Sequence, residues 1–476
     1  SSSVEKFAST LLDAQVDLNP HQIEASLFAF KSPFSKGALL ADEVGLGKTI
    51  EAGIVIAQKW AERKRKILII APSSIRKQWS QELLEKFYLP SQILETKSFN
   101  ENFKKGNANP FCSNEIIICS YQFASKKGEH IKNIEWDLIV IDEAHRLRNV
   151  LKSSNKIAKT IKEAIINRKK ILLTATPLQN SLLELYGLVS FIDDYAFGDL
   201  DSFKAQYSRI TEQENYDELK ARLAPVCKRT LRRQVLQYVK YTNRIAIREE
   251  FIPSDEEQTL YDLVSEYLQR EHLYALPNSQ RQLITLVLRK LLSSSTFAIA
   301  GAIDTIVKRL KEVLKNLTAK YNLDEALTDN FEGIEEISEE WEEEEEKDDK
   351  KKELTASDIK AIEREIKELE AFREVAVSIM QNAKGLKLLE ALKTGFIKMQ
   401  DLGANPKALI FTESRKTQDY LLKLLGENGY GDKIVLFNGS NNDEQSRRIY
   451  ASWFERNKNT DQVSGSKTAD MRTALV

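Results

Sequence analysis

Two short segments of the sequence combine glycines, hydroxyl groups, a lysine and adjacent carboxylates. Residues 41–49 read Ala-Asp-Glu-Val-Gly-Leu-Gly-Lys-Thr, and residues 142–145 read Asp-Glu-Ala-His. A glycine-containing turn between a strand and a helix aims backbone N–H groups at phosphate oxygens. In such a turn Lys48 would lie on the β- and γ-phosphates, and the Thr49 hydroxyl on Mg²⁺. The first segment therefore predicts a phosphate-binding loop.

The second segment ends the apolar run 138–141. A strand there would place the Asp142 carboxylate at its carboxyl end, facing the first loop, where Asp142 could hold the metal. Glu143 could then orient and deprotonate an attacking water. Alone, each segment also fits an ordinary turn or a solvated acidic loop. Together they predict an ATPase that uses ATP and Mg²⁺, with Lys48, Asp142 and Glu143 as catalytic residues and Thr49 and Asp142 on the metal.

A third segment could sense the nucleotide. Residues 171–180 read Ile-Leu-Leu-Thr-Ala-Thr-Pro-Leu-Gln-Asn, a short apolar run that closes in Thr174, Ala175 and Thr176. Small hydroxyl residues at a strand end can hydrogen-bond the carboxylates of a neighbouring loop and so couple to it. The alternative is a strand with an ordinary proline-terminated turn.

Gln22 is a candidate for the base of the nucleotide. Its amide has the paired donor and acceptor that an adenine edge needs. A lone glutamine usually lies on the surface, so this assignment depends on the other motifs.

The motifs are set in apolar runs of strand length that alternate with helical patterns. The runs lie at residues 37–41, 67–71, 116–120, 138–142 and 171–175. This alternation predicts an α/β fold with a doubly wound, mostly parallel sheet, and ligands at the carboxyl ends of its strands. The loop, the paired carboxylates and the threonines all fall at those ends.

The order of these motifs resembles the helicase superfamily 2 ATPases, and within them the SNF2-like (Swi2/Snf2) translocases. Residues 42–49 are similar to the family's DExGLGKT form of motif I, which accounts for Asp42 where a glycine is usual. Residues 142–145 are similar to its DEAH motif II, and residues 172–180 to its LTATPLQN motif III. Val44, followed by Ile-Glu-Ala-Gly at 50–53, is closest to bacterial members of the RNA-polymerase-associated type.

Three further segments, residues 67–79, 116–121 and 407–412, resemble motifs Ia, Ib and IV. The resemblance implies two RecA-like domains with ATP in the cleft between them, and movement along double-stranded DNA without strand separation. The residues on the nucleotide would be Gln22, Asp42, Glu43, Gly45, Leu46, Gly47, Lys48 and Thr49. Those on DNA would be Ser73, Ser74, Arg76, Ser120, Tyr121, Arg229 and Arg232.

The DNA residues have physical arguments beside the resemblance. Ser73 and Ser74 open a predicted helix, whose N-terminus is a good phosphate seat, although a serine there also serves as an N-cap. Arg229 and Arg232 belong to a basic cluster that equally fits a solvated face.

The chain is predicted to have three parts. Residues 1–250 would be the first RecA-like ATPase domain, residues 251–383 a helical insertion, and residues 384–476 an incomplete second RecA-like domain with strands at 408–412 and 434–437. An apolar stripe from residue 359 to 375 predicts a helix that packs in a core, or an arm that grips DNA. No segment resembles motif V or the arginine-bearing motif VI, so slow ATP hydrolysis, or none, is expected.

An acidic run at residues 332–353 predicts a disordered or solvated loop, or a tether that competes with DNA. The whole chain has 70 Lys and Arg against 71 Asp and Glu. Without the acidic run the remainder is basic, which suits a phosphate-binding surface.

Composition also bounds location and partners. Three cysteines without metal-ligand spacing suit a reducing cytosol, and the apolar runs are too short for a membrane span of ~20 residues. We expect a cytoplasmic monomer whose recruiting partner is RNA polymerase or a defence or restriction complex. Two alternatives stay open: a nucleotide-dependent switch or scaffold, and a helicase that separates strands of RNA or DNA.

Overall fold

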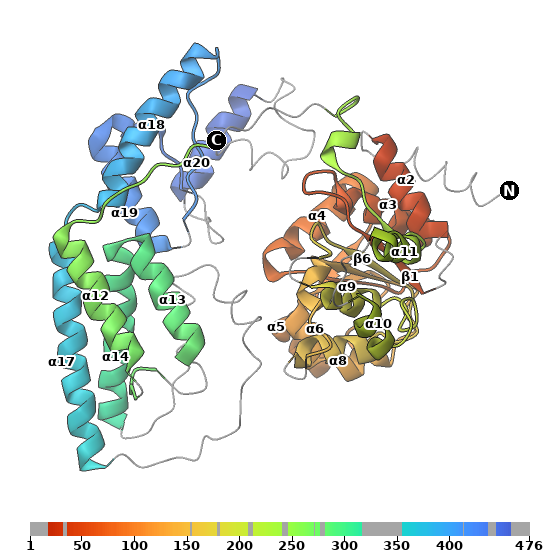
Figure 1. Cartoon of the computed structure of the whole chain (residues 1–476), viewed down its shortest axis with the longest axis horizontal. Coiled ribbons are helices and arrows are strands. Elements are labelled where there is room, and N and C mark those ends of the chain that lie inside the picture. Colours follow the sequence, from red (N-terminus) through yellow and green to blue (C-terminus); the bar gives the residue numbers. More distant parts are fainter. Residues whose placement is uncertain are drawn as a thin grey trace. The chain divides into compact units, whose positions relative to one another are not determined.

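The computed structural model describes residues 18–31, 36–152, 155–178, 181–207, 213–239, 246–270, 272–276, 281–316, 355–412, 414–436 and 444–457. The chain divides into two compact units, Ser1–Asn243 and Arg244–Val476 (Figure 1). The finer division at residues 250 and 383 stays a prediction.

The first unit is built on a seven-stranded sheet in the order β3-β4-β2-β5-β6-β1-β7. Its strands are β1 (Gly37–Leu40), β2 (Ile67–Ile70), β3 (Ser91–Ile93), β4 (Ile116–Cys119), β5 (Leu138–Asp142), β6 (Lys170–Leu173) and β7 (Cys227–Lys228). All recorded pairs are parallel. Leu173 is level with both Leu40 and Asp142. The segments that follow β1, β5 and β6 therefore leave the sheet at one edge.

Helices cover both faces of this sheet, because alternate side chains along each strand point to opposite faces. On one face, Leu40 and Leu138 share a core with α2 (Pro20–Lys31), α3 (Lys48–Ala61) and α4 (Arg76–Phe87). On the other, Leu39 and Ile139 share a second core. Its helices are α5 (Thr96–Lys104), α6 (Tyr121–Lys126), α7 (Gly128–Lys132), α8 (Lys156–Ala164), α9 (Leu182–Val189), α10 (Leu200–Tyr207) and α11 (Gln213–Leu223). The predicted α/β, doubly wound fold class is confirmed.

Two strands were not predicted from the sequence. They are β3 and β7, which lie at the two edges of the sheet. Edge strands have one neighbour only, and the sequences Ser-Gln-Ile and Cys-Lys contain no apolar run. The signal that predicts a central parallel strand is therefore missing from both.

The second unit begins with packed helices. These are α12 (Asp255–Gln269), α13 (Arg281–Ser294), α14 (Thr296–Asn316) and α17 (Ala356–Ser378), and α14 and α17 lie side by side in Figure 1. Ile362, Ile366 and Leu369 of α17 are buried in the core that these helices share. The stripe predicted between residues 359 and 375 is thus a helix that packs in a core.

The unit continues with α18 (Ala383–Asp401), α19 (Arg415–Leu425) and α20 (Glu444–Asn457). The strand predicted at 408–412 is wrong, and none is assigned to residues 434–436. Residue 437 lies outside the described residues. Leu409 is 59% and Phe411 86% exposed, and no strand among the described residues pairs with this segment, so it forms no ladder. The helices expected after both segments are present.

Residues 332–353, the acidic run, lie outside the described residues. None of the described helices is both long and apolar enough to cross a lipid bilayer. Cys112, Cys119 and Cys227 are all free thiols.

Candidate nucleotide-binding site

The loop between β1 and α3 has the backbone form that a phosphate cradle requires. Gly45 and Gly47 have φ angles of 83° and 89°, which L-residues rarely adopt. A Cβ atom added to Gly47 would lie 2.3 Å from Gln22 Nε2. Lys48 is the first residue of α3, so the unpaired N–H groups of that helix end follow the loop directly.

Asp142 ends β5, and three donors hold it. Its Oδ2 accepts a hydrogen bond from Trp79 Nε1 at 2.8 Å, and its Oδ1 accepts one from Glu143 N at 2.9 Å. Its main-chain oxygen accepts a bond from the Tyr121 hydroxyl at 2.5 Å. Burial raises the pKa of Asp142 to about 6 and Glu143 adds to the rise, while the Trp79 indole and the Lys48 ammonium oppose it.

Lys48 interacts with both the loop and these carboxylates. Its Nζ donates to Asp42 O at 2.9 Å. Its charge also acts on the carboxyls of Asp142 and Glu143, although burial and the nearest hydrogen bonds act more strongly on their pKa values. The structure thus brings together the two segments that carry the predicted chemistry.

Glu143 has a left-handed backbone, with φ of 53°. The His145 side chain, whose Nδ1 is 3.2 Å from Glu143 Oε2, lowers the pKa of Glu143, and burial opposes this. Glu143 is therefore ionised at neutral pH and able to accept a proton. The same Nδ1 lies 3.3 Å from Thr174 Oγ1, which also accepts a hydrogen bond from Thr176 N at 3.1 Å. The third motif therefore reaches the second through the His145 ring and not, as predicted, directly through a carboxylate.

A buried cluster of His21, Asp42 and Glu51 lies behind the loop. Their potential ligand atoms lie within 4.8 Å of one another. His21 Nε2 donates to Leu46 O at 2.9 Å. If Glu51 were ionised, four buried atoms would lack a partner: His21 Nδ1, Asp42 Oδ2 and both Glu51 carboxylate oxygens.

A proton on the Glu51 carboxyl relieves part of this conflict, because it pairs Glu51 with Asp42. Burial raises the pKa of Glu51 to about 9, and the adjacent Asp42 adds to the rise. At neutral pH the Glu51 carboxyl is therefore protonated and donates to Asp42. The same donor types would suit a divalent cation, and binding one would require the loss of that proton.

Gln22 contacts the loop itself. Its Nε2 donates to Leu46 O at 3.0 Å, and its Oε1 accepts from Asn19 N at 3.1 Å. The side chain is 6% exposed. Gln22 therefore braces the loop that carries the phosphate cradle, and its predicted contact with adenine stays a proposal.

The segment after β7 also braces the loop, which the sequence did not predict. Thr230 N donates to Asp42 Oδ1 at 2.6 Å, and Arg232 N donates to Glu43 Oε2 at 2.7 Å. The Arg232 guanidinium donates to Val44 O through Nε at 3.0 Å and Nη2 at 2.6 Å. Arg232 was predicted to contact DNA; in this structure its guanidinium contacts the loop, and the DNA contact stays a prediction.

The other predicted DNA residues differ in exposure. Ser74 and Arg229 are exposed and Ser73 is half-buried. Ser73 and Ser74 lie in a short 3₁₀ turn, η1 (Ser73–Ile75), before α4, so the N-cap position of α4 is Ile75. Arg76 is half-buried and pairs with Glu95 at 3.0 Å.

Ser120 and Tyr121 correct the prediction. Ser120 is 7% exposed and is the N-cap of α6, since its hydroxyl accepts from Phe123 N at 3.2 Å. Tyr121 is 2% exposed and points to Asp142. Neither side chain is presented to a ligand outside the molecule.

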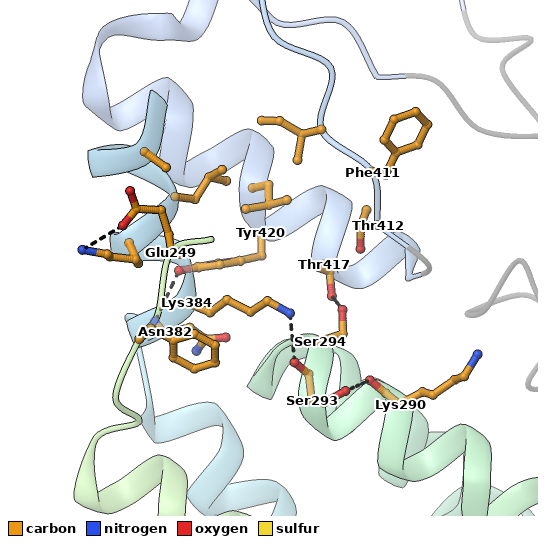
Figure 2. A pocket seen from close by; sticks show the side chains of 17 residues that line it. Glu249, Lys290, Ser293, Ser294, Asn382, Lys384, Phe411, Thr412, Thr417 and Tyr420 are labelled. Carbon is orange, nitrogen blue, oxygen red and sulfur yellow. Dashed lines mark hydrogen bonds and ion pairs between the residues drawn. The ribbon is translucent and has the colours of Figure 1, made fainter. Parts of the chain in front are cut away.

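A separate pocket of about 840 Å³ lies within the second unit (Figure 2). Lys384 Nζ donates to Ser293 O at 3.3 Å, and the hydroxyls of Ser294 and Thr417 are 2.9 Å apart. Phe411 and Thr412, from the segment that resembles motif IV, also line it. None of the residues predicted to bind the nucleotide lines this pocket.

Fold and site define a P-loop α/β protein: a parallel sheet with a glycine-containing loop after β1 and paired carboxylates at the end of β5. Comparison with known families gives a match to the SNF2-related domain over residues 21–320. This match covers more than half of the chain, which therefore belongs to the family of SNF2-related domain proteins.

Two relatives show the range of similarity. The chain is 30% identical over 324 residues to YqhH of Bacillus subtilis (strain 168), described as an uncharacterized ATP-dependent helicase, covering 63% of this chain and 54% of YqhH. It is 35% identical over 215 residues to the RNA polymerase-associated protein RapA of Proteus mirabilis (strain HI4320), covering 44% of this chain and 21% of RapA. The chain thus spans about half of one relative and a fifth of the other.

Among solved structures, one similar chain is the Sulfolobus solfataricus SWI2/SNF2 ATPase core in complex with double-stranded DNA. It is 22% identical, with a TM-score of 0.41, and the match covers 67% of this chain and 70% of that one.

Proposed function

We propose that this chain binds Mg²⁺–ATP at the loop after β1 and hydrolyses it as the core of a translocase on double-stranded DNA. The observation that carries the proposal is the position of Lys48. Its ammonium donates to Asp42 O of the left-handed glycine loop, and its charge acts to lower the pKa of both Asp142 and Glu143.

The residues present fit this cofactor. Backbone N–H groups of the loop and the start of α3, with Lys48, would hold the phosphates. Thr49 and Asp142 would hold Mg²⁺, which when bound neutralises charge on the phosphate oxygens. Ionised Glu143 would orient a water and accept its proton. Gln22 would contact adenine from its place beside the loop.

Duplex DNA is the proposed substrate because the family resemblance implies it and the exposed Ser74 and Arg229 suit phosphate contacts. RNA polymerase or a defence or restriction complex remains the proposed partner, and a cytoplasmic monomer the proposed state. We also propose slow turnover, since no segment of the sequence resembles the family's arginine motif, and such an arginine is worth ~10³–10⁵ in rate in related enzymes.

Single-turnover hydrolysis of γ-labelled ATP, with protein in excess, tests this function because it detects slow chemistry. The proposal predicts that blunt duplex DNA raises the rate several-fold. It also predicts that Glu143→Gln and Lys48→Ala remove hydrolysis. A rate that DNA leaves unchanged would favour the switch or scaffold, and displacement of one strand of the duplex would favour the strand-separating helicase.

A further inference from the structure

We propose that the buried cluster of His21, Asp42 and Glu51 is a structural site for a divalent transition-metal cation such as Zn²⁺, distinct from the Mg²⁺ that would accompany ATP. The inference does not rest on the proposed function, because none of the atoms that would bind this cation is assigned to Mg²⁺. It gives a role to buried groups that the proposed hydrolysis does not use.

The cluster contains several buried polar atoms without a partner. His21 is 3% exposed, and Asp42 and Glu51 are 0% exposed. Among the described residues, no hydrogen-bond partner reaches His21 Nδ1, Asp42 Oδ2 or either carboxylate oxygen of Glu51. A proton shared by Glu51 and Asp42 satisfies only part of this set. Buried polar atoms are normally paired, so four of them in one place point to a cation.

The donor types and their number match a closed zinc site. The ligand atoms that the three residues offer lie within 4.8 Å of one another. Structural zinc is four-coordinate, with bonds of about 2.0–2.2 Å to imidazole nitrogen and carboxylate oxygen. Tetrahedral ligands at that distance are ~3.4 Å apart, so a shift of roughly 1 Å closes the set around a cation. An imidazole favours Zn²⁺ over Mg²⁺, which prefers oxygen ligands and keeps several waters.

The charges of the set also balance. A divalent cation between two carboxylates and a neutral imidazole leaves no net charge on the assembly, whereas an uncompensated buried charge is costly. Without a cation the two carboxyls are unfavourable neighbours: burial, and then Asp42, raise the pKa of Glu51 to about 9, while Lys48 opposes the rise. Binding therefore releases the Glu51 proton to solvent and forms metal–oxygen bonds in its place.

Outer hydrogen bonds already orient two of the ligands. His21 Nε2 donates to Leu46 O at 2.9 Å, and a metal-bound histidine commonly donates its other ring N–H to a backbone carbonyl. The neutral tautomer that makes this bond has its free lone pair on Nδ1. Asp42 Oδ1 accepts from Thr230 N at 2.6 Å, and its Oδ2 belongs to the cluster. Both side chains thus have the outer partners that metal ligands need.

A cation at this cluster would join three elements around the phosphate loop. His21 lies in α2, Asp42 follows β1, and Glu51 is in the first turn of α3. The helices α2 and α3 lie side by side (Figure 1). The cation would therefore tie both ends of the loop to α2. Because the cluster is closed to solvent, its role is structural.

Metal analysis after refolding tests the site directly, because refolding gives the cation access to a buried position. The chain is unfolded in urea with a chelator, refolded with excess Zn²⁺, separated from loose metal by gel filtration and analysed for zinc. We expect about one tightly held Zn²⁺ per chain. The affinity, measured by competition with a chromophoric chelator, should fall at least ~100-fold in His21→Gln and in Glu51→Gln, since loss of even an outer partner costs about 10–100-fold.

Two matched variants control for zinc bound elsewhere. Glu24 is in the same helix as His21, and its side chain is 65% exposed in an ion pair with Lys228. His145 lies beside Glu143, so its replacement shows whether zinc binds at the paired carboxylates instead. Glu24→Gln and His145→Gln should both keep the bound Zn²⁺ at full affinity.

Two further readouts separate a buried site from surface binding. Zn²⁺ should raise the melting temperature of the unaltered chain, because a ligand that binds only the folded state stabilises it, and should leave that of Glu51→Gln unchanged. Co²⁺ in place of Zn²⁺ should absorb visible light without the charge-transfer band of a cysteine ligand. Circular dichroism confirms folding, and with chelator present Glu51→Gln should melt no lower than the unaltered chain, since glutamine keeps a donor for Asp42.

An unaltered chain that refolds without bound Zn²⁺ would overturn the inference. So would full affinity in either His21→Gln or Glu51→Gln, loss of zinc in His145→Gln, or a Co²⁺ spectrum with a cysteine band. Mg²⁺ that displaces Zn²⁺ at similar concentration would contradict the class of cation. Nucleotide binding depends on Lys48 and Asp142 and is measured separately, so each of these failures leaves the proposed function standing.

Discussion

Burial raises the pKa of two carboxyl groups, Glu51 and Asp142, but leaves them in different ionisation states at neutral pH. Glu51 is 0% exposed and has a pKa raised to about 9 by burial and by Asp42. Asp142 is 7% exposed, with a pKa raised by burial to about 6. At neutral pH the first is a neutral donor inside the protein, whereas the second is an anion able to hold a cation.

Glu51→Gln should therefore stabilise the protein. The folded state keeps the proton on Glu51 up to a pH of about 9, whereas the unfolded chain releases it near the ordinary glutamate pKa of 4.5. The stability that Glu51 contributes is thus complete below pH 4.5 and declines as pH rises through this window. Glutamine keeps a donor for Asp42 and has no proton to lose. We expect a gain on the order of 1–3 kcal/mol in the free energy of unfolding at pH 7.5.

Urea denaturation at pH 6 and pH 8.5 measures this effect. The advantage of Glu51→Gln should be larger at the higher pH. Glu24→Gln is the control, since its side chain is 65% exposed in an ion pair with Lys228. A destabilised Glu51→Gln protein with an unchanged pH dependence would show that Glu51 is ionised in the fold.

Asp142 predicts a pH dependence for metal-supported nucleotide binding. Its carboxylate must be ionised to hold Mg²⁺, and the fraction ionised falls as pH drops through about 6. We expect the tightening of ATP binding by Mg²⁺ to decline between pH 7 and pH 5. Titrations with and without Mg²⁺ test this, and Asp142→Asn should show a small Mg²⁺ effect at every pH. A Mg²⁺ effect as large at pH 5 as at pH 7 would contradict the assignment.

At the scale of elements, the loop after β1 is held in one form by neighbours on both sides. Gln22 of α2 and Arg232, after β7, both donate to loop carbonyls. Gly47→Ala should lower nucleotide affinity at least ~10-fold, because its φ of 89° is strained for alanine and the added Cβ would lie 2.3 Å from Gln22 Nε2.

Gly106→Ala is the matched control, since Gly106 has a φ of 90° and no atom within 4 Å of an added Cβ. It should cost about 1 kcal/mol of stability from backbone strain alone and leave nucleotide affinity unchanged. Isothermal calorimetry with an ATP analogue compares the two. Equal losses of affinity would show that general strain, and not the loop, explains the effect.

The sequence predicted those elements whose signal is local. The apolar runs before Asp42 and Asp142 predicted β1 and β5. They thereby predicted that Lys48 and Glu143 follow the carboxyl ends of these strands. It did not predict contacts between distant residues: 63 residues separate Trp79 from Asp142, and 188 separate Arg232 from Val44. Trp79 did carry one usable signal. A tryptophan inside a helix is usually buried with a partner for its N–H group.

Exposure was the property least accessible from local pattern. Ser120 and Tyr121 follow a strand as a phosphate-contacting segment would, yet both are buried. The side chain of a tyrosine at a helix start can be exposed or buried. For Tyr121 the position of β5, which is distant in sequence, decides between the two. The strand predicted at residues 408–412 was wrong for a related reason. A strand needs a hydrogen-bonded neighbour, and the local sequence pattern does not show whether one is present.

At the scale of the whole molecule, the sequence predicts that the acidic run can be separated from the folded parts. Deleting residues 335–352 should change the melting temperature by less than about 2 °C, because a solvated charge run buries little surface. DNA affinity should stay level or rise if the run competes with phosphate. A Gly/Ser segment of equal length in its place separates the effect of charge from that of chain length. A melting temperature several degrees lower would show that the run is packed.

The most direct test of the account is the affinity of this chain for a fluorescent ATP analogue with Mg²⁺, measured by anisotropy for the unaltered chain and for Lys48→Ala. Lys48 is the residue that joins the loop to the carboxylates, and a charge-assisted bond to phosphate contributes about 1.5–3 kcal/mol. The account predicts micromolar-range binding that weakens at least ~10-fold in Lys48→Ala and not at all in Lys64→Ala, a surface control. Equal affinity in all three proteins would contradict it.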